Sequence, residues 1–144
     1  MTKTVSIPSV DVFTRLWLHE CSRVFCDRLI NDQDRLFFRE LVMDLLKTKF
    51  KVNWKEDEVF GKSQTIFSML LRIDAEEKLY EEITDKNKLF KMLEDKLTDY
   101  NISNASKMDL VFFDDAIFHI ARISRILRQP RGNAMLIGVS GCGK

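Results

Sequence analysis

Apolar residues recur at helical spacing near the start of the chain. The first such stretch covers residues 10–30 and follows Ser9, a residue type that caps helix N-termini. Six residues lie near one line of a helix that turns about 100° per residue: Val10, Phe13, Trp17, Cys21, Val24 and Arg28. We therefore predict a helix that buries this side, with Trp17 in the core.

A second helix is predicted after the polar turn Asn31–Asp34. Its apolar side consists of Phe37, Leu41 and Leu45, with Phe38 and Val42 beside them. Residues 50–84 contain short apolar runs without a sustained period, so this part predicts connectors with one short strand or helix.

Two further helices are predicted in the second half of the chain. The third begins near Thr84 or Asp85, and polar residues 101–106 end it. Its apolar side is made by Leu89, Leu93, Leu97 and Tyr100. The fourth ends before Pro130, which cannot continue a helix. Its apolar side is made by Phe113, Ala116, Ile120, Ile123 and Leu127.

The last residues have the spacing of a phosphate-binding loop. An apolar run at residues 134–138 is typical of a buried strand in a parallel sheet, and it leads into Gly138, Gly141, Gly143 and Lys144. Glycines let backbone N–H groups approach phosphates closely, and the lysine neutralises them. The helix that completes such a site would follow Lys144.

Four helices followed by one strand predict a mainly α fold. We expect a four- or five-helix bundle, followed by the first strand and the truncated loop of an α/β domain. Residues 1–104 would form the helical domain with its connector helices. Residues 105–144 would form a linker helix, the strand and the loop.

Composition fits a folded domain and gives no electrostatic sign of a nucleic-acid or membrane partner. The chain has 144 residues, of which 45% are hydrophobic and 31% charged, and its net charge is +1. No apolar run has the length of a membrane span. We therefore expect neither nucleic acid nor a membrane as a partner.

Candidate chemistry outside the loop is sparse. Cys21 and Cys26 point about 140° apart on the first helix and cannot share a metal ion with His19, so we expect no metal site. We expect His119 to pack or to form hydrogen bonds. The acidic pairs at residues 81–82 and 114–115 predict solvated faces.

The arginines divide into three groups. Four of them spread over half the circumference of the fourth helix, so they do not line one face and predict mostly solvated surface. They are Arg122, Arg125, Arg128 and Arg131. Arg28 lies on the apolar side of the first helix and would need Asp32 or Asp34 as partner. Arg23 lies beside that side, where it could reach outward.

Three stretches resemble the dynein heavy chain family. Residues 16–38, "LWLHECSRVFCDRLINDQDRLFF", resemble the helical lid of its third AAA module. Residues 108–144, "MDLVFFDDAIFHIARISRILRQPRGNAMLIGVSGCGK", resemble the entry into its fourth module, up to the P-loop. Residues 97–103, "LTDYNIS", look like the connector between the two. The resemblance implies an AAA+ lid-type bundle within an ATP-driven microtubule motor.

Site residues follow from this resemblance. Arg23 matches the sensor-two arginine, which reaches the phosphates of the nucleotide held by the preceding module. Gly138, Gly141, Gly143 and Lys144 match the next module's phosphate loop. Leu110–Phe113 would lie near that module's adenine pocket.

The resemblance also implies ligands, partners and a location. ATP or ADP with Mg²⁺ would bind in the parent protein, with none held tightly by this chain. Partners would be the neighbouring AAA+ modules and, through the parent, microtubules and other dynein chains. The location would be the cytoplasm and cytoskeleton. The "PRGN" stretch resembles axonemal chains and favours the cilium, although Ser140 and Cys142 depart from the usual axonemal loop.

Two other classes stay open from the residues alone: an independent small NTP-binding protein, and a helical protein-interaction module. The chain shows no Walker B acid on a strand and no helix after Lys144. We therefore expect it to be inactive as an ATPase by itself.

Overall fold

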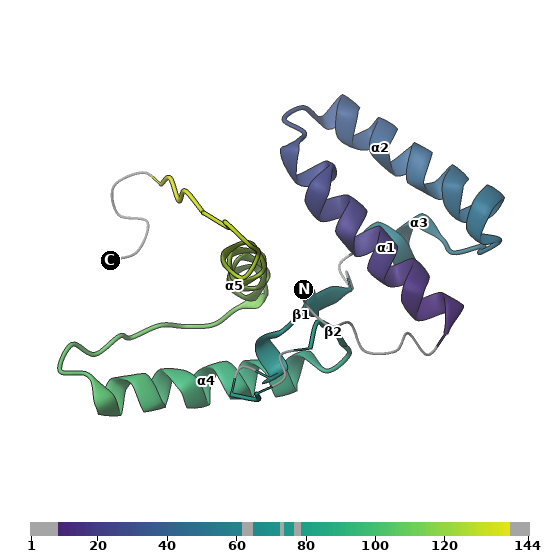
Figure 1. Cartoon of the computed structure of the whole chain (residues 1–144). Helices are drawn as coiled ribbons and strands as arrows, with labels where there is room; N and C mark the ends of the chain where they lie inside the picture. Colours follow the sequence, from purple (N-terminus) through teal and green to yellow (C-terminus); the bar gives the residue numbers. More distant parts are fainter. Residues whose placement is uncertain (1–8, 62–64, 73, 77–78, 139–144) are drawn as a thin grey trace.

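The computed structural model describes residues 9–61, 65–72, 74–76 and 79–138. Helices α1 (Val10–Val24) and α2 (Asp32–Leu45) form a pair at one end of the molecule (Figure 1). α1 begins where the Ser9 side chain accepts a hydrogen bond from the Val12 amide, as predicted. Asn31 caps α2 in the same way through the Asp34 amide.

A first apolar cluster holds this pair together with the segment that follows. The chain leaves α2 through a π-helical turn, Leu46–Phe50, and forms the short helix α3 (Glu56–Phe60). The buried members of the cluster are Leu18, Phe38, Val42, Leu46 and Val59. Trp17 is only partly buried and packs against this cluster, with its ring 4.7 Å from that of Phe50.

A second apolar cluster lies under the remaining elements. Strands β1 (Ile66–Ser68) and β2 (Glu81–Ile83) pair antiparallel, with Ile66 opposite Ile83. A 3₁₀ turn, Leu70–Arg72, follows β1, and helices α4 (Lys86–Ser103) and α5 (Asp114–Leu127) cover the cluster. Its buried members are Ile66, Leu70, Ile83, Leu89, Leu93, Ile117 and Ala121.

The buried side of α1 differs from the predicted side. Val10, Phe13 and Val24 are exposed, whereas the buried line runs through Thr14, Leu18 and Ser22. The two hydroxyls are satisfied inside the helix, because Thr14 donates to the Val10 carbonyl at 2.8 Å and Ser22 to the Leu18 carbonyl at 2.9 Å. Small polar residues can therefore occupy buried positions that a hydrophobic pattern does not mark.

In α1 the buried line lies one residue further along the chain than the predicted line, and the same shift occurs in α2 and α5. In α2, Phe38 and Val42, predicted beside the central apolar line, are buried, whereas Phe37 and Leu41 of that line are 66% and 47% exposed. In α5, the buried residues are Ile117 and Ala121, and Phe113 and Leu127 are exposed. Both helices carry apolar residues over a wide arc, so the pattern predicted the helices correctly but not which line of each faces the core.

The third predicted helix agrees best with the structure. α4 begins after the N-cap Asp85 and buries Leu89 and Leu93, as expected. It continues to Ser103, so residues 101–103 belong to the helix rather than ending it. The region between residues 50 and 84, expected to hold one short strand or helix, contains α3, β1 and β2.

The segment after α5 carries no helix or strand between residues 132 and 138. Its apolar side chains Met135, Leu136 and Ile137 are 75–85% exposed. This is the run predicted as the first strand of the next domain. A strand needs hydrogen-bonding neighbours to form, and none of the described residues pairs with it. The loop residues from 139 onward lie outside the described part.

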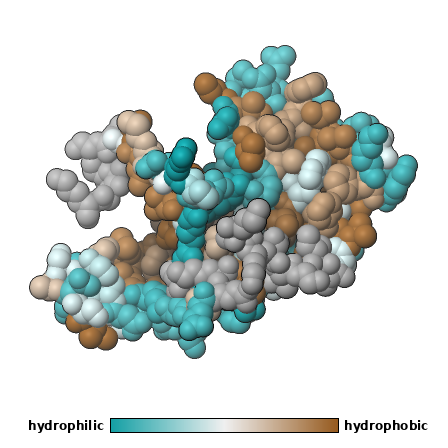
Figure 2. All heavy atoms as spheres, viewed as in Figure 1, coloured by the Kyte–Doolittle hydropathy of each residue, from teal (hydrophilic) through white to brown (hydrophobic). Residues whose placement is uncertain are grey.

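Figure 2 shows that apolar side chains also reach the surface over α1 and α2. Exposed large apolar residues of this pair include Val10, Phe25, Leu36, Phe37 and Leu41. Among the described residues, no helix combines the length and the apolar character that crossing a membrane would require.

The first cluster predicts a sharp difference between two leucines of the same region. Leu46 has no exposed surface, so Leu46→Ala should lower the free energy of unfolding by about 2–5 kcal/mol through lost burial and the cavity left behind. Leu41 is 47% exposed, and Leu41→Ala should cost less than about 1 kcal/mol. Urea titration of the two variants measures both, and equal losses would contradict this assignment of the core.

Candidate functional site

The side of α1 that faces away from α2 carries charged residues, and these meet α5. Arg125 of α5 forms a two-pronged ion pair with Glu20 of α1 through its Nε and Nη2 atoms. The Tyr80 hydroxyl donates to the same carboxylate at 2.8 Å. Burial alone would raise the pKa of Glu20, but the hydrogen bonds from Arg125 and Tyr80 hold that pKa below its ordinary value. Glu20 is therefore a charged anchor for α5.

A second ion pair fastens α1 to the small sheet. Arg15 donates to both carboxylate oxygens of Glu82 on β2, at 2.7 and 3.0 Å. The neighbouring Glu81 accepts from Arg72 at 3.1 Å. The prediction of a solvated face for this acidic pair was wrong, because each carboxylate has an arginine partner, Glu82 from 67 positions away and Glu81 from nine.

His19 lies between these contacts. Its Nδ1 is 3.2 Å from the Thr65 carbonyl, and because a carbonyl only accepts, Nδ1 carries the hydrogen in this contact. The ring lies 5.5 Å from the ring of Phe67. Burial, together with the charge of Arg23, lowers the pKa of His19 from 6.5 to about 4. His19 is thus neutral near pH 7.

Arg23 points into the molecule. Its side chain is only 8% exposed, and its Nη2 lies 3.3 Å from Oδ1 of Asp27, one helical turn further along. Arg122 of α5 reaches the same oxygen at 3.7 Å. Burial, and next the charge of Arg122, lower the pKa of Arg23. The sequence predicted an arginine that reaches outward, whereas Asp27 and α5 hold it inside.

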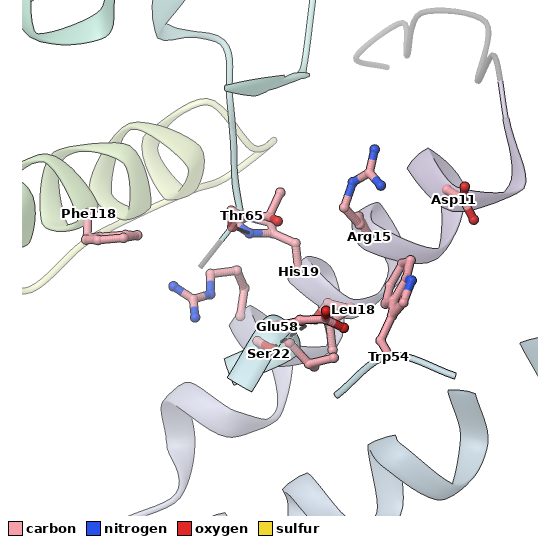
Figure 3. Close-up of a pocket in the computed structure, with 11 residues that line it drawn as sticks. Asp11, Arg15, Leu18, His19, Ser22, Trp54, Glu58, Thr65 and Phe118 are labelled. Carbon is pink, nitrogen blue, oxygen red and sulfur yellow. Dashed lines mark hydrogen bonds between the residues drawn. The ribbon is translucent and has the colours of Figure 1, made fainter. Parts of the chain in front are cut away.

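A cavity of about 270 Å³ opens beside this cluster, between α1, the segment with α3, and α5 (Figure 3). Arg15, His19 and Arg23 line it together with the acidic Asp11 and Glu58. Trp54 and Phe118 enter from opposite sides. The cavity thus combines the buried guanidinium of Arg23 with carboxylates and apolar walls.

The remaining predicted site residues lie elsewhere. Gly138 is exposed at the end of the described chain. Gly141, Gly143 and Lys144 lie outside the described residues. Leu110–Phe113 carry no helix or strand, and Phe112 alone of them packs against the second cluster. The structure therefore places Arg23 in a cluster of charged residues, and of the predicted loop residues it describes only Gly138.

Several other expectations need correction. Arg28 is exposed rather than buried, since α1 ends at Val24 and the chain turns before it. Arg125 is mostly buried in its pair with Glu20, not solvated. His119 is exposed, although it was expected to pack or to form hydrogen bonds.

The cysteines of the first helix were considered as metal ligands. Cys21 and Cys26 are partly buried against the first cluster, and within the described residues no group of three His, Cys, Asp or Glu could hold a metal.

The residues that sequence reasoning missed are Glu20, Tyr80, Asp27 and Arg122. Their partners are up to 105 positions away, so no local spacing marks them. The arginines of α5 and the acids of α1 were visible, but only the fold shows which acid meets which arginine.

Comparison with known proteins assigns both ends of the chain to AAA+ modules. Residues 2–62 match the family described as "AAA+ lid domain", and residues 108–144 match "P-loop containing dynein motor region D4". A helical lid that leads into a P-loop region is the class of protein that the fold and these matches define.

Similar curated proteins identify the family. Human "Dynein axonemal heavy chain 6" is 41% identical over 132 residues, covering 90% of this chain and 3% of that protein. Mouse "Dynein axonemal heavy chain 1" is 42% identical over 130 residues, which cover 90% of this chain and 3% of that protein. "Dynein beta chain, ciliary" from Tripneustes gratilla is 42% identical over 132 residues, which cover 92% of this chain and 3% of that protein. The chain belongs to the dynein heavy chain family, and it spans about 3% of the length of these relatives.

The ion pair between α1 and α5 should contribute measurably to stability. Arg125→Gln removes the charge that faces the half-buried Glu20, so the free energy of unfolding should fall by about 1–3 kcal/mol. Arg28→Gln is the matched control, since Arg28 is exposed and should change stability by less than about 0.5 kcal/mol. Equal effects in guanidinium titrations would show that the pair does not hold α5.

His19 predicts a pH dependence of stability. Between pH 6.5 and about 4 the unfolded chain binds a proton at this residue and the folded chain does not, so the free energy of unfolding should fall as the pH drops through that window. In His19→Gln the free energy of unfolding should fall by roughly 1–3 kcal/mol less between pH 7 and 4.5 than in the wild type. Urea titrations at the two pH values measure this difference. His119→Gln, which changes an exposed histidine of α5, is the matched control, and an equal effect of the two variants would contradict the assignment to His19.

Proposed function

We propose that this chain is the lid and inter-module connector of an ATP-driven microtubule motor, and that it transmits nucleotide state from one AAA+ module to the next. The observation that carries this proposal is the Glu20–Arg125 pair. It ties α1, within the part that matches an AAA+ lid, to α5, within the part that matches dynein region D4. A movement of the lid would therefore reach α5 directly.

Arg23 is the proposed reader of the nucleotide held by the preceding module. Its guanidinium lines the 270 Å³ cavity and is held by one partly exposed carboxylate. A buried arginine with a single weak partner has donors to offer to phosphate oxygens, and its planar fork suits them. We propose that it turns from Asp27 to those oxygens when nucleotide binds.

The phosphate loop would belong to the next module. Gly138, Gly141, Gly143 and Lys144 would cradle ATP or ADP, with Mg²⁺ held by residues beyond this chain. Leu110–Phe113 would lie near its adenine pocket. Their exposed apolar side chains, Leu110 at 52% and Val111 at 80%, offer surface for such a contact.

The chain would divide at the connector after α4, with the lid in residues 1–104 and the entry into the next module in residues 105–144. Its direct partners would be the neighbouring modules of the same heavy chain, and microtubules and other dynein chains would bind the parent. The names of the relatives, axonemal and ciliary, support a place in the axoneme of cilia, within the cytoskeleton.

The test of Arg23 uses a dynein motor domain that contains these residues. Arg23→Ala should weaken binding of a fluorescent ATP analogue to the preceding module by about tenfold, because a charge-assisted hydrogen bond to phosphate is lost. Arg28→Ala is the control, an exposed arginine in the turn after α1. Unchanged affinity in the Arg23 variant would overturn the reader role.

The chain by itself should neither hydrolyse ATP nor bind it tightly. Hydrolysis needs a metal-holding acid and a positioned water, and tight phosphate binding needs a helix behind the loop. Calorimetric titration with Mg·ATP should therefore give a dissociation constant weaker than about 100 μM. Sub-micromolar binding that Lys144→Ala abolishes would favour an independent NTP-binding protein instead.

A further inference from the structure

Three charged side chains meet where α1 ends beside α5. Asp27 lies in the 3₁₀ turn Cys26–Arg28 that follows α1, and its side chain is 30% exposed. One of its oxygens, Oδ1, lies 3.3 Å from Nη2 of Arg23 and 3.7 Å from Nη2 of Arg122. Two arginines, one from the lid helix and one from the helix that leads to the phosphate loop, therefore share one carboxylate oxygen.

Neither arginine is well satisfied by this arrangement. Charge-assisted N–H···O bonds are usually about 2.7–2.9 Å long, and both contacts to Asp27 are longer. The Nε atoms of Arg23 and Arg122 are buried, and no described residue accepts a hydrogen bond from them. Their positive charges also repel each other, as the effect of Arg122 on the pKa of Arg23 shows.

The neighbouring ion pairs are different in kind. Arg15 grips both oxygens of Glu82, and Arg125 grips both oxygens of Glu20. In each of these two-pronged pairs both carboxylate oxygens accept a hydrogen bond from the arginine, and the pairs hold α1 against β2 and α5. The contacts of Asp27 are long and both end on one oxygen, so these are the contacts that a small movement can rearrange.

We propose that Asp27 is a positioning residue that couples the nucleotide-reading Arg23 to Arg122, and so to α5. When a phosphate group of the bound nucleotide takes the guanidinium of Arg23, Asp27 becomes free to close on Arg122 and tightens α5 against α1. When the phosphate leaves, Arg23 returns and the hold of Asp27 on Arg122 weakens. The coupling to nucleotide rests on the proposed role of Arg23, whereas the competition for Asp27 does not.

The competition is tested by amide hydrogen exchange in the 144-residue chain without nucleotide. Asp27→Asn and Arg122→Gln should each make the amides of α5 exchange about three- to tenfold faster, since each removes the adjustable contact. Arg23→Met keeps the buried stem but removes the competitor, so the α5 amides should exchange more slowly, by about twofold or more. Arg23 and Asp27 are partners, yet their variants should change the exchange in opposite directions.

Two controls separate this device from general destabilisation. Asp44→Asn changes an exposed carboxylate of α2 and should leave exchange in α5 as in the wild type. The double variant Arg23→Met/Asp27→Asn should lose the slowing caused by Arg23→Met alone, because no carboxylate remains to close on Arg122. Amides of α2 serve as the internal standard, and they should exchange at wild-type rates in every variant.

The outcomes are distinct. Faster exchange of α5 in Arg23→Met would make Arg23 a simple structural link and overturn the competition. Unchanged exchange in Asp27→Asn would overturn it as well. If the exchange pattern appears but Arg23→Ala leaves nucleotide affinity unchanged in the motor domain, the shared carboxylate stands and its link to nucleotide is overturned.

Discussion

The hold of Glu20 on Arg125 and Tyr80 is the contact on which the arrangement of the molecule depends. The two apolar clusters share no buried residue, and α1 belongs to the first cluster while it also contacts β1, which belongs to the second. Its apolar side belongs to the cluster with α2, and its charged side meets β2 and α5. Each cluster is small, and small cores supply little stability of their own. The ion pairs along α1 therefore decide how the two halves sit against each other.

Helix positions could be predicted from the sequence, but the buried lines could not. The period of apolar residues and the capping residues Ser9 and Asp85 indicate where α1 and α4 begin, although α1 ends at Val24 and not near residue 30. Thr14 and Ser22 then show why the buried line of α1 escaped prediction. Their hydroxyls are satisfied by carbonyls of the same helix, so these residues can be buried although a hydrophobic pattern does not mark them.

The candidate site was predictable only in its motif residues. The glycine loop follows from its spacing, and the role of Arg23 follows from a resemblance over a short stretch. Whether Arg23 points outward or inward depends on Asp27, one turn away, and on Arg122, almost a hundred positions away. Contacts such as Arg15 with Glu82 join segments whose pairing depends on the whole fold. Residues 50–84 lacked a period because β1 and β2 are too short to produce one.

An interface made of ion pairs suits the proposed role of this chain, which is to transmit a movement between modules. Closely packed apolar surfaces resist small displacements, because each fraction of an ångström opens a gap or causes a clash. Long charged side chains tolerate such displacements, since a guanidinium can rotate and change partners while the backbones stay close. In this chain each part keeps its own apolar cluster, and the residues that meet between them are Glu20 of α1, Asp27 of the turn after α1, and Arg122 and Arg125 of α5. Stiffness within each half and exchangeable contacts between them are what a connector between two modules requires. A rearrangement of the Asp27 contacts at the junction of α1 and α5 would therefore leave both apolar clusters as they are.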